Sequence, residues 1–389
     1  MKKLFYKKLI SLSLVFCLMG GTFCFAQEEE EEDDFDAMFA EATGDVEVEQ
    51  SAPVLPASGS SGLSSLIGLS GHFDADLGLS ALILDKPDFG GYLSLNNSLY
   101  MNVSPNPVVS IHGGIGTSLS NKFSLGLSHI YFDYLLFDRI FISAGLKGVS
   151  WGYVRMMSEG NVMADTNGML NAEVRYPWST GTFTFVGAYN YAALTPNPSY
   201  TNITMAASLE QTIGHTSVNL FGKKYGNSEK KSPLAGLEVK RTIFGFDTYA
   251  QGVVRFNNLK KLDSKAGYQN VCAIAGFYRL WDGFDPNIGI NIEYNYVYIP
   301  NPSKDEKAHN NKIALQWGIK RIGKNKNMKG AIDWNHNFTS GDGNLVAAYI
   351  FDGILPYASW RNAVSVDYGR SYKRPQFKMA TTISLSLDY

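Results

Sequence analysis

The chain has 389 residues, of which 18% are charged and 13% aromatic, with 22 tyrosines, 38 glycines and a formal net charge of −2. Soluble domains usually carry about 25% charged residues, so the charge content of this chain is low. With a net charge of −2, we expect no nucleic-acid partner. After residue 26 there is no apolar run of the roughly 20 residues that a membrane-spanning helix needs. The chain is therefore either an exported soluble protein or a membrane protein in which apolar and polar residues alternate.

Residues 1–26 have the pattern of a secretory signal peptide. Four lysines precede an apolar run from Leu9 to Phe25, and Ala26 is a plausible cleavage point. A membrane anchor is disfavoured because the run is short and interrupted, and a lipoprotein is disfavoured because Cys17 and Cys24 each follow Phe. Cleavage would leave Cys272 as the last cysteine, without an intramolecular disulfide partner.

Residues 27–61 hold twelve acidic residues and no basic one. Such a composition cannot bury enough apolar surface to fold alone, so we expect a disordered acidic segment in the periplasm. Phe35, Met38, Phe39 and Ala42 would share one helical face, which leaves open a docking peptide for a periplasmic partner or a partial plug. Residues 62–389 hold 30 basic and 24 acidic residues, so the body is mildly basic.

From Phe73 onward, segments with a period of two follow one another between turn residues, which predicts strands. In 287–299, for example, Ile288, Ile290 and Ile292 alternate with Gly289, Asn291 and Glu293. We expect eighteen strands, with sixteen or fourteen possible because 139–153, 268–280 and 345–352 alternate poorly. The expected strands are 72–84, 92–103, 108–119, 123–132, 139–153, 168–176, 183–194, 202–213, 216–225, 234–243, 246–256, 268–280, 287–299, 309–322, 329–338, 345–352, 360–369 and 376–389.

These strands favour a closed barrel in lipid over a large soluble β protein. One face of each strand is aliphatic with aromatic ends, and the other carries Asn, Ser, Thr, Gly and few charges. A sheet can cross a bilayer only if it closes and leaves no edge. The alternate connections, which would lie outside, are mostly the longer ones. The sequence therefore predicts an all-β, transmembrane, antiparallel up-and-down barrel over 62–389, with 154–167 as the candidate inward loop after the fifth strand.

The last predicted strand, FKMATTISLSLDY, has a specific pattern. Phe377, Met379, Ile383, Leu385 and Leu387 share one face, and Tyr389 is a terminal aromatic residue. This segment resembles the terminal recognition signal of the bacterial outer-membrane β-barrel superfamily, in its porin-like form. The resemblance implies an outer-membrane location in a diderm bacterium, recognition by the barrel-assembly machinery, and closure of this strand against the first one.

No sequence pattern for chemistry was found. The six histidines show no HExxH spacing, and no GxSxG stretch occurs. We expect no enzyme activity, no catalytic residue, no metal site and no cofactor.

A barrel of about sixteen to eighteen strands is too wide for wall side chains to fill, so it leaves an aqueous channel. The sequence predicts passive diffusion of small hydrophilic solutes with a weak anion preference. A transporter of hydrophobic compounds similar to the fatty-acid uptake barrels, and a surface adhesin or structural barrel, are the alternatives. Outer-membrane lipid is an expected partner, and the sequence leaves open whether the chain forms a homo-oligomer. Candidate pore-lining residues, which could equally just solvate the wall, are Glu173, Arg175, Glu210, Glu238, Lys240, Arg255, Glu293, Lys312, Lys320, Asp333, Asp367 and Lys378.

Overall fold

The computed structural model describes residues 67–83, 88–120, 122–190, 202–226, 232–257, 259, 261–262, 264–281, 286–304, 306–322, 327–353, 355 and 357–389. The expected signal peptide at 1–26 and acidic segment at 27–61 lie outside these residues. Within them no helix is both long and apolar enough to cross a membrane.

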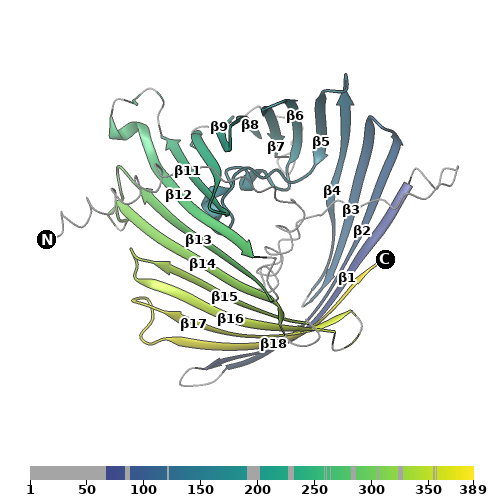
Figure 1. Cartoon of the computed structure of the whole chain (residues 1–389), viewed down its shortest axis with the longest axis vertical. Coiled ribbons are helices and arrows are strands. Elements are labelled where there is room, and N and C mark those ends of the chain that lie inside the picture. The colour runs from purple at the N-terminus through teal and green to yellow at the C-terminus, as the bar shows by residue number, and fades with distance from the viewer. Residues whose placement is uncertain are drawn as a thin grey trace.

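In the part of the chain that the structure describes, one antiparallel sheet contains eighteen strands, which confirms the expected number. Figure 1 shows the strands arranged as the wall of a barrel. Each expected strand overlaps one observed strand. The strands are β1 (Ile67–Ile83), β2 (Asp88–Asn106), β3 (Val109–Leu119), β4 (Phe123–Leu136), β5 (Ile140–Leu146), β6 (Leu170–Trp178), β7 (Gly181–Tyr189), β8 (Ile203–Ile213), β9 (Thr216–Tyr225), β10 (Leu234–Ile243), β11 (Phe246–Phe256), β12 (Tyr268–Trp281), β13 (Asn287–Tyr298), β14 (His309–Ile322), β15 (Met328–Asn337), β16 (Asp342–Asp352), β17 (Ala358–Tyr368) and β18 (Gln376–Asp388).

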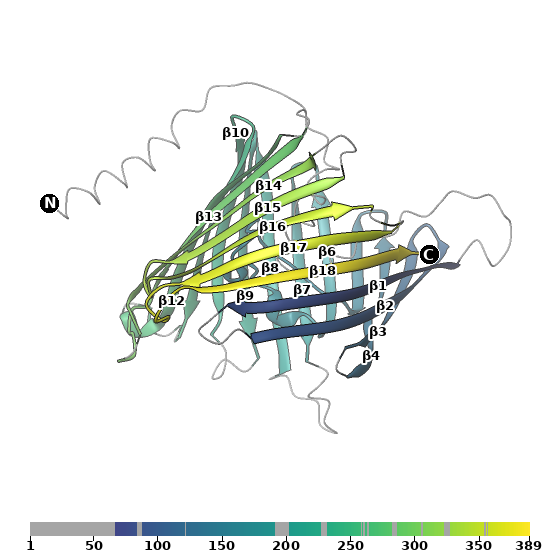
Figure 2. The same ribbon diagram turned by 90° about the horizontal axis from the view of Figure 1, so that it is seen from below.

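The barrel closes because β18 pairs with β1 as well as with β17. The register of this last seam runs from His72 opposite Asp388 to Ile83 opposite Phe377, and Figure 2 shows β17, β18, β1 and β2 side by side. Every other strand pairs with its neighbours in the chain. The fold is therefore a closed, up-and-down, antiparallel β-barrel, as the sequence predicted.

Alternation along the strands separates an outward apolar face from an inward face that carries most of the polar side chains. On β18, Met379 and Ile383 are 49% and 52% exposed, whereas Thr382 between them is 6% exposed. On β13, Asn291, Glu293 and their neighbour Asn295 are 1% exposed or less on the inner face. Because adjacent strands are paired in register, these faces join into one continuous outer surface and one continuous inner surface.

The connections differ at the two ends of the barrel. Phe244 and Gly245, with φ values of 55° and 75°, form a two-residue turn between β10 and β11, which requires a left-handed backbone at both positions. The connection between β5 and β6, in contrast, is long. The sequence predicted that the fifth strand would continue to residue 153, but β5 ends at Leu146. After Leu146 the chain leaves the wall and enters the interior of the barrel.

Candidate functional site: the lumen and its inward loop

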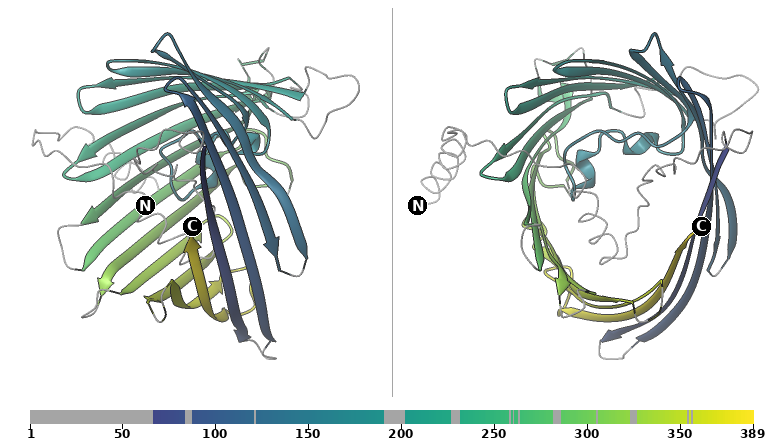
Figure 3. Two further views of the ribbon diagram at one scale, coloured as in Figure 1. Left: turned by 90° about the vertical axis from the view of Figure 1, so that its right-hand side faces the viewer. Right: turned by 45° about the vertical axis from the view of Figure 1, so that its right-hand side comes forward.

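Residues 147–169, here called the lumen loop, lie inside the barrel. Figures 1 and 3 show this teal segment within the ring of strands. It contains two short 3-10 turns, at Ser158–Gly160 and Ala164–Thr166. The last rungs of β5 require a glycine at position 145, because its φ is 142° and a Cβ there would lie 2.2 Å from the carbonyl oxygen of Ile130. The expected inward loop at 154–167 is confirmed and is longer than predicted.

Glu293 on β13 binds the backbone of the lumen loop. One carboxylate oxygen accepts the amide hydrogen of Arg155 at 2.6 Å, and the other accepts those of Met156 and Met157 at 3.0 and 2.8 Å. The hydroxyl of Tyr249 on β11 donates a further hydrogen bond to the first oxygen at 2.6 Å. A buried carboxylate is stable when its oxygens accept several hydrogen bonds. These bonds therefore hold both Glu293 and the loop in place.

Two more carboxylates on the same wall bind Tyr153. Glu238 on β10 accepts a hydrogen bond from the Tyr153 amide at 3.2 Å, and Glu210 on β8 accepts one from the Tyr153 hydroxyl at 2.6 Å. Burial and this second bond raise the pKa of Tyr153, so its hydroxyl remains a donor. The side-chain amide of Gln251 donates hydrogen bonds to the carboxylate of Glu238 at 2.6 Å and to the loop carbonyl of Gly160 at 2.8 Å, and so links the two.

The second half of the loop is held by two lysines of the wall. Lys223 on β9 donates to the Val162 carbonyl at 2.5 Å and pairs with Asp165. Lys312 on β14 pairs with Glu159, with its Nζ 2.7 Å from Oε1. Burial raises the pKa of Glu159, but the hydrogen bond and charge of Lys312 outweigh it, so the net pKa is lowered.

The underside of the loop packs on an apolar part of the inner wall. Val149, Met157, Val162 and Met163 are at most 8% exposed. They form one buried cluster with side chains of β7 to β14: Val186, Ala206, Phe221, Leu234, Val253, Cys272, Ile274 and Ala314. These residues explain why an inward-facing wall carries aliphatic side chains: the loop covers them. The combination of apolar packing and charged hydrogen bonds fixes the loop against one side of the lumen.

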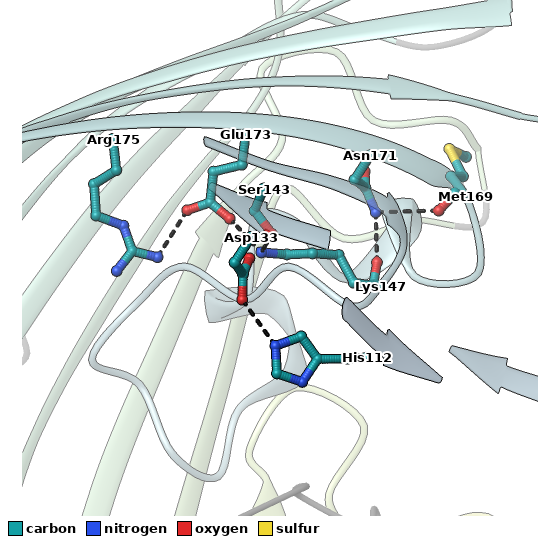
Figure 4. Close-up of polar contacts among 8 residues, drawn as sticks. All are labelled: His112, Asp133, Ser143, Lys147, Met169, Asn171, Glu173 and Arg175. Carbon is teal, nitrogen blue, oxygen red and sulfur yellow. Dashed lines mark hydrogen bonds and ion pairs between the residues drawn. The ribbon is translucent and has the colours of Figure 1, made fainter. Parts of the chain in front are cut away.

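A polar cluster lies at the root of the loop, where β5 ends (Figure 4). Lys147 places its Nζ 2.8 Å from both Ser143 Oγ and Glu173 Oε2, and Arg175 pairs with the other oxygen of Glu173 at 2.9 Å. Asn171 donates to the Lys147 carbonyl at 2.5 Å. Nearby, His112 lies 3.3 Å from Asp133. This cluster fixes the point at which the chain turns inward.

The candidate pore-lining residues all have inward register positions but differ in their surroundings. Glu238 and Glu293 are 1% and 0% exposed beneath the loop, and Glu173 is paired at its root. Lys312 faces Glu159. On the opposite wall, Lys378 pairs with Asp367 at 2.6 Å and is half exposed. Asp333 accepts hydrogen bonds from its neighbours on β14 and β15. The structure thus brings Glu210, Glu238 and Glu293 together under the loop and leaves Asp367 and Lys378 across the lumen.

Sequence reasoning missed the loop's own contributors and several wall partners. They are Lys147, Tyr153, Arg155, Glu159, Asp165, Asn171, Lys223 and Gln251. Arg155 has its guanidinium 4.1 Å from the ring centre of Tyr278. One signal was present: Glu293 is a carboxylate in the middle of an otherwise uncharged strand, flanked by Asn291 and Asn295. Such a residue needs hydrogen-bond donors from elsewhere in the chain.

An 18-stranded closed barrel with an apolar outer face and a loop folded into its lumen has the fold of the bacterial outer-membrane porin-like β-barrels. No protein-family model matches the chain, and no curated protein is significantly similar to it in sequence.

Solved structures share this fold at low sequence identity. The chain is similar to OccK2 (OpdF) of Pseudomonas aeruginosa in complex with glucuronate, with a TM-score of 0.55 and 9% identity over 82% of this chain and 98% of that one. It is similar to Pseudomonas aeruginosa OpdK with vanillate, with a TM-score of 0.52 and 10% identity over 82% and 99%. It is also similar to the outer membrane protein OpdK of the same organism, with a TM-score of 0.52 and 9% identity over 83% and 99%. At these identities the likeness concerns the fold.

Proposed function

We propose that this protein is a channel of the bacterial outer membrane through which small hydrophilic solutes diffuse passively. The observation that carries the proposal is the lumen loop, bound by buried carboxylates to one side of an 18-stranded barrel. A barrel of this size is too wide for its wall side chains to fill. A loop fixed against one wall would narrow this passage, and we infer that a water-filled opening remains beside it.

The charges of the body favour small anions. Residues 62–389 carry 30 basic and 24 acidic residues, and a positive body attracts anions into a water-filled passage. Glucuronate and vanillate, which occur in two of the structures with this fold, both have a carboxyl group. Carboxylated solutes are therefore the first to test. The proposed location requires export with removal of residues 1–26 and insertion by the barrel-assembly machinery through the strand from Phe377 to Tyr389.

The test is electrical recording from purified protein in planar lipid bilayers. We expect stepwise conductance and, under a salt gradient, a reversal potential on the anion-selective side. Swelling of liposomes containing the protein should report entry of glucuronate and similar solutes. Absence of stepwise conductance from protein whose barrel is intact by electrophoresis would overturn the proposal.

A further inference from the structure

The outward face of the barrel carries two arginines close to the end that has the two-residue turns. On β10, Leu237 is 42% exposed on the outer surface, and Arg241 follows it on the same face of the alternating strand. On β12, Phe277 is 36% exposed on the outer surface, and Arg279 is the next residue on that face. Both arginines are half-buried, and both lie on the surface that contacts lipid.

The neighbouring turn and two aromatic rings hold Arg279 in place. Its Nη1 donates a hydrogen bond to the carbonyl oxygen of Phe244 at 2.6 Å. Its guanidinium carbon lies 5.0 Å from the ring centre of Phe246 and 4.9 Å from that of Trp281, and these two rings meet edge to face. A Cβ at Gly245 would lie 3.1 Å from the guanidinium carbon. We call Arg279, Phe244, Phe246 and Trp281 the arginine clamp. The guanidinium is therefore oriented before any ligand binds.

Neither arginine has an anionic partner within the described residues. A guanidinium has five N–H donors, and the Phe244 carbonyl accepts from one of those on Arg279. The Nε of Arg241 is buried without a hydrogen bond. A positive charge on the lipid-facing side of a barrel is unfavourable unless something pairs with it. The other described side chains near these strand ends on the same face are uncharged: Ile243, Thr248, Phe277 and Ile290.

The position of the clamp determines which anion can reach it. Aromatic side chains at the ends of barrel strands lie at the level of the lipid head groups, and Trp281 and Phe244 occupy such positions beside the turn. On the outer surface at this level, the anionic group available is the phosphate of a lipid head group. The paired N–H groups of a guanidinium match two phosphate oxygens. An outward-facing arginine clamp therefore fits the phosphate of a membrane lipid.

Arg241 makes the net charge of that lipid important. The register places Arg241 opposite Thr248, and Thr248 opposite Phe277 on β12. Neighbouring strands are about 4.8 Å apart, so the backbones of the two arginines are on the order of 12 Å apart, and their long side chains shorten the distance between the charges. A zwitterionic head group would bring its own ammonium group close to two guanidinium groups. An anionic head group brings no positive charge.

We propose that the arginine clamp binds the phosphate of an anionic phospholipid, with Arg241 as a second positive charge beside the site. The guanidinium of Arg279 donates hydrogen bonds to the phosphate oxygens, and the acyl chains lie over outward-facing residues such as Leu237 and Phe277. The proposal requires the membrane location but not conductance. A barrel that conducts no ions can still bind the lipid, so failure of the channel proposal is distinguishable from failure of this one.

The experiment is native mass spectrometry of the full protein in detergent, titrated with phosphatidylglycerol or with phosphatidylcholine of the same acyl chains. Arg279→Gln removes the charge of the clamp, and Arg279→Lys keeps the charge but removes the paired N–H groups. The matched control is Arg321→Gln, which removes an exposed arginine at the same end of the barrel, on β14. Heat-modifiable migration on SDS gels verifies that each barrel is folded.

We expect the wild type to bind one phosphatidylglycerol more tightly than phosphatidylcholine. Arg279→Gln should weaken phosphatidylglycerol binding about tenfold or more, the loss expected for a hydrogen bond between charged groups. Arg279→Lys should weaken it less, and Arg321→Gln should leave it unchanged. Equal binding of the two lipids by the wild type would overturn the preference for an anionic lipid. Equal losses in Arg279→Gln and Arg321→Gln, or no loss in a folded Arg279→Gln barrel, would overturn the site.

Discussion

Replacing Glu293 by Gln should release the first half of the lumen loop. Glu293 accepts hydrogen bonds from three consecutive backbone amides and from Tyr249. An amide of the same shape keeps one acceptor oxygen and turns an NH2 group toward the other donors. Each buried donor left unpaired costs about 1 to 3 kcal/mol. A loss of about 3 kcal/mol lowers the ratio of attached to released loop by about two orders of magnitude.

The assay is single-channel recording combined with limited trypsin digestion at Arg155. Glu293→Gln should increase conductance and current noise and should speed cleavage after Arg155. Heat-modifiable migration on SDS gels should stay as in the wild type, because the backbone ladder of the eighteen strands is untouched. The control is Glu306→Gln, which alters an exposed acid that caps Ser303 outside the lumen loop. Unchanged conductance and cleavage in Glu293→Gln, with an intact barrel, would refute the role assigned to this carboxylate.

Three further predictions concern the other anchors and the seam. Lys223→Met removes the cation that pairs with Asp165 and should speed amide hydrogen exchange in 161–167 by about tenfold or more, measured by mass spectrometry; equal exchange would contradict the anchoring role. The lowered pKa of Glu159 means that the stability from its pair with Lys312 is complete above the ordinary value of 4.5 and is lost as pH falls through the lowered value. Conductance should therefore rise in acid, and Glu159→Gln, which lacks this pair at every pH, should raise conductance at neutral pH and make the remaining acid rise smaller; an unchanged profile would contradict the role of the pair. Tyr389→Ala should reduce the heat-modifiable folded fraction, because the Tyr389 hydroxyl bonds to β2 at 2.7 Å across the seam; normal assembly would argue against it.

The barrel could be predicted because its signal is local. Period-two alternation needs only neighbouring residues, and β13 shows it from Asn287 to Tyr298 with Glu293 on the inner face. The two-residue turn at Phe244 and Gly245 was placed correctly for the same reason. The predicted end of the fifth strand, at residue 153, was wrong, because β5 ends at Leu146. The residues after Leu146 have no change of pattern that would distinguish a strand of the wall from a loop. Just after the strand, Lys147 is held by Glu173 of β6 and Ser143 of β5, and these contacts between strands cannot be seen in the local pattern.

The contacts of the lumen loop could not be read from the sequence, because they join residues far apart in the chain. Arg155 and Glu293 are 138 positions apart, and Tyr153 and Glu238 are 85 apart. The lone carboxylate of Glu293 in an uncharged strand indicated that it needs hydrogen-bond donors, but the sequence does not show whether water or the backbone of a distant segment supplies them. The apolar residues on the inner wall of β7 to β14 could not be predicted to contact a loop either. Val186 and Ile274 lie on the inward face, where a water-filled barrel gives no reason for aliphatic side chains.

The two sides of the lumen therefore differ in what their charged side chains contact. On β7 to β14, the inner wall is buried by the loop, and its carboxylates are satisfied by loop donors. The charged side chains on this wall fix the position of the loop, and the loop separates them from the rest of the lumen. On β17 and β18, Asp367 and Lys378 face each other away from the loop, with Lys378 half exposed. If the protein is the channel proposed above, a solute passing between the loop and this wall would meet those charges directly. We therefore propose that selectivity depends on pairs such as Asp367 and Lys378, and that the width of the passage depends on Glu293, Glu238 and Lys223.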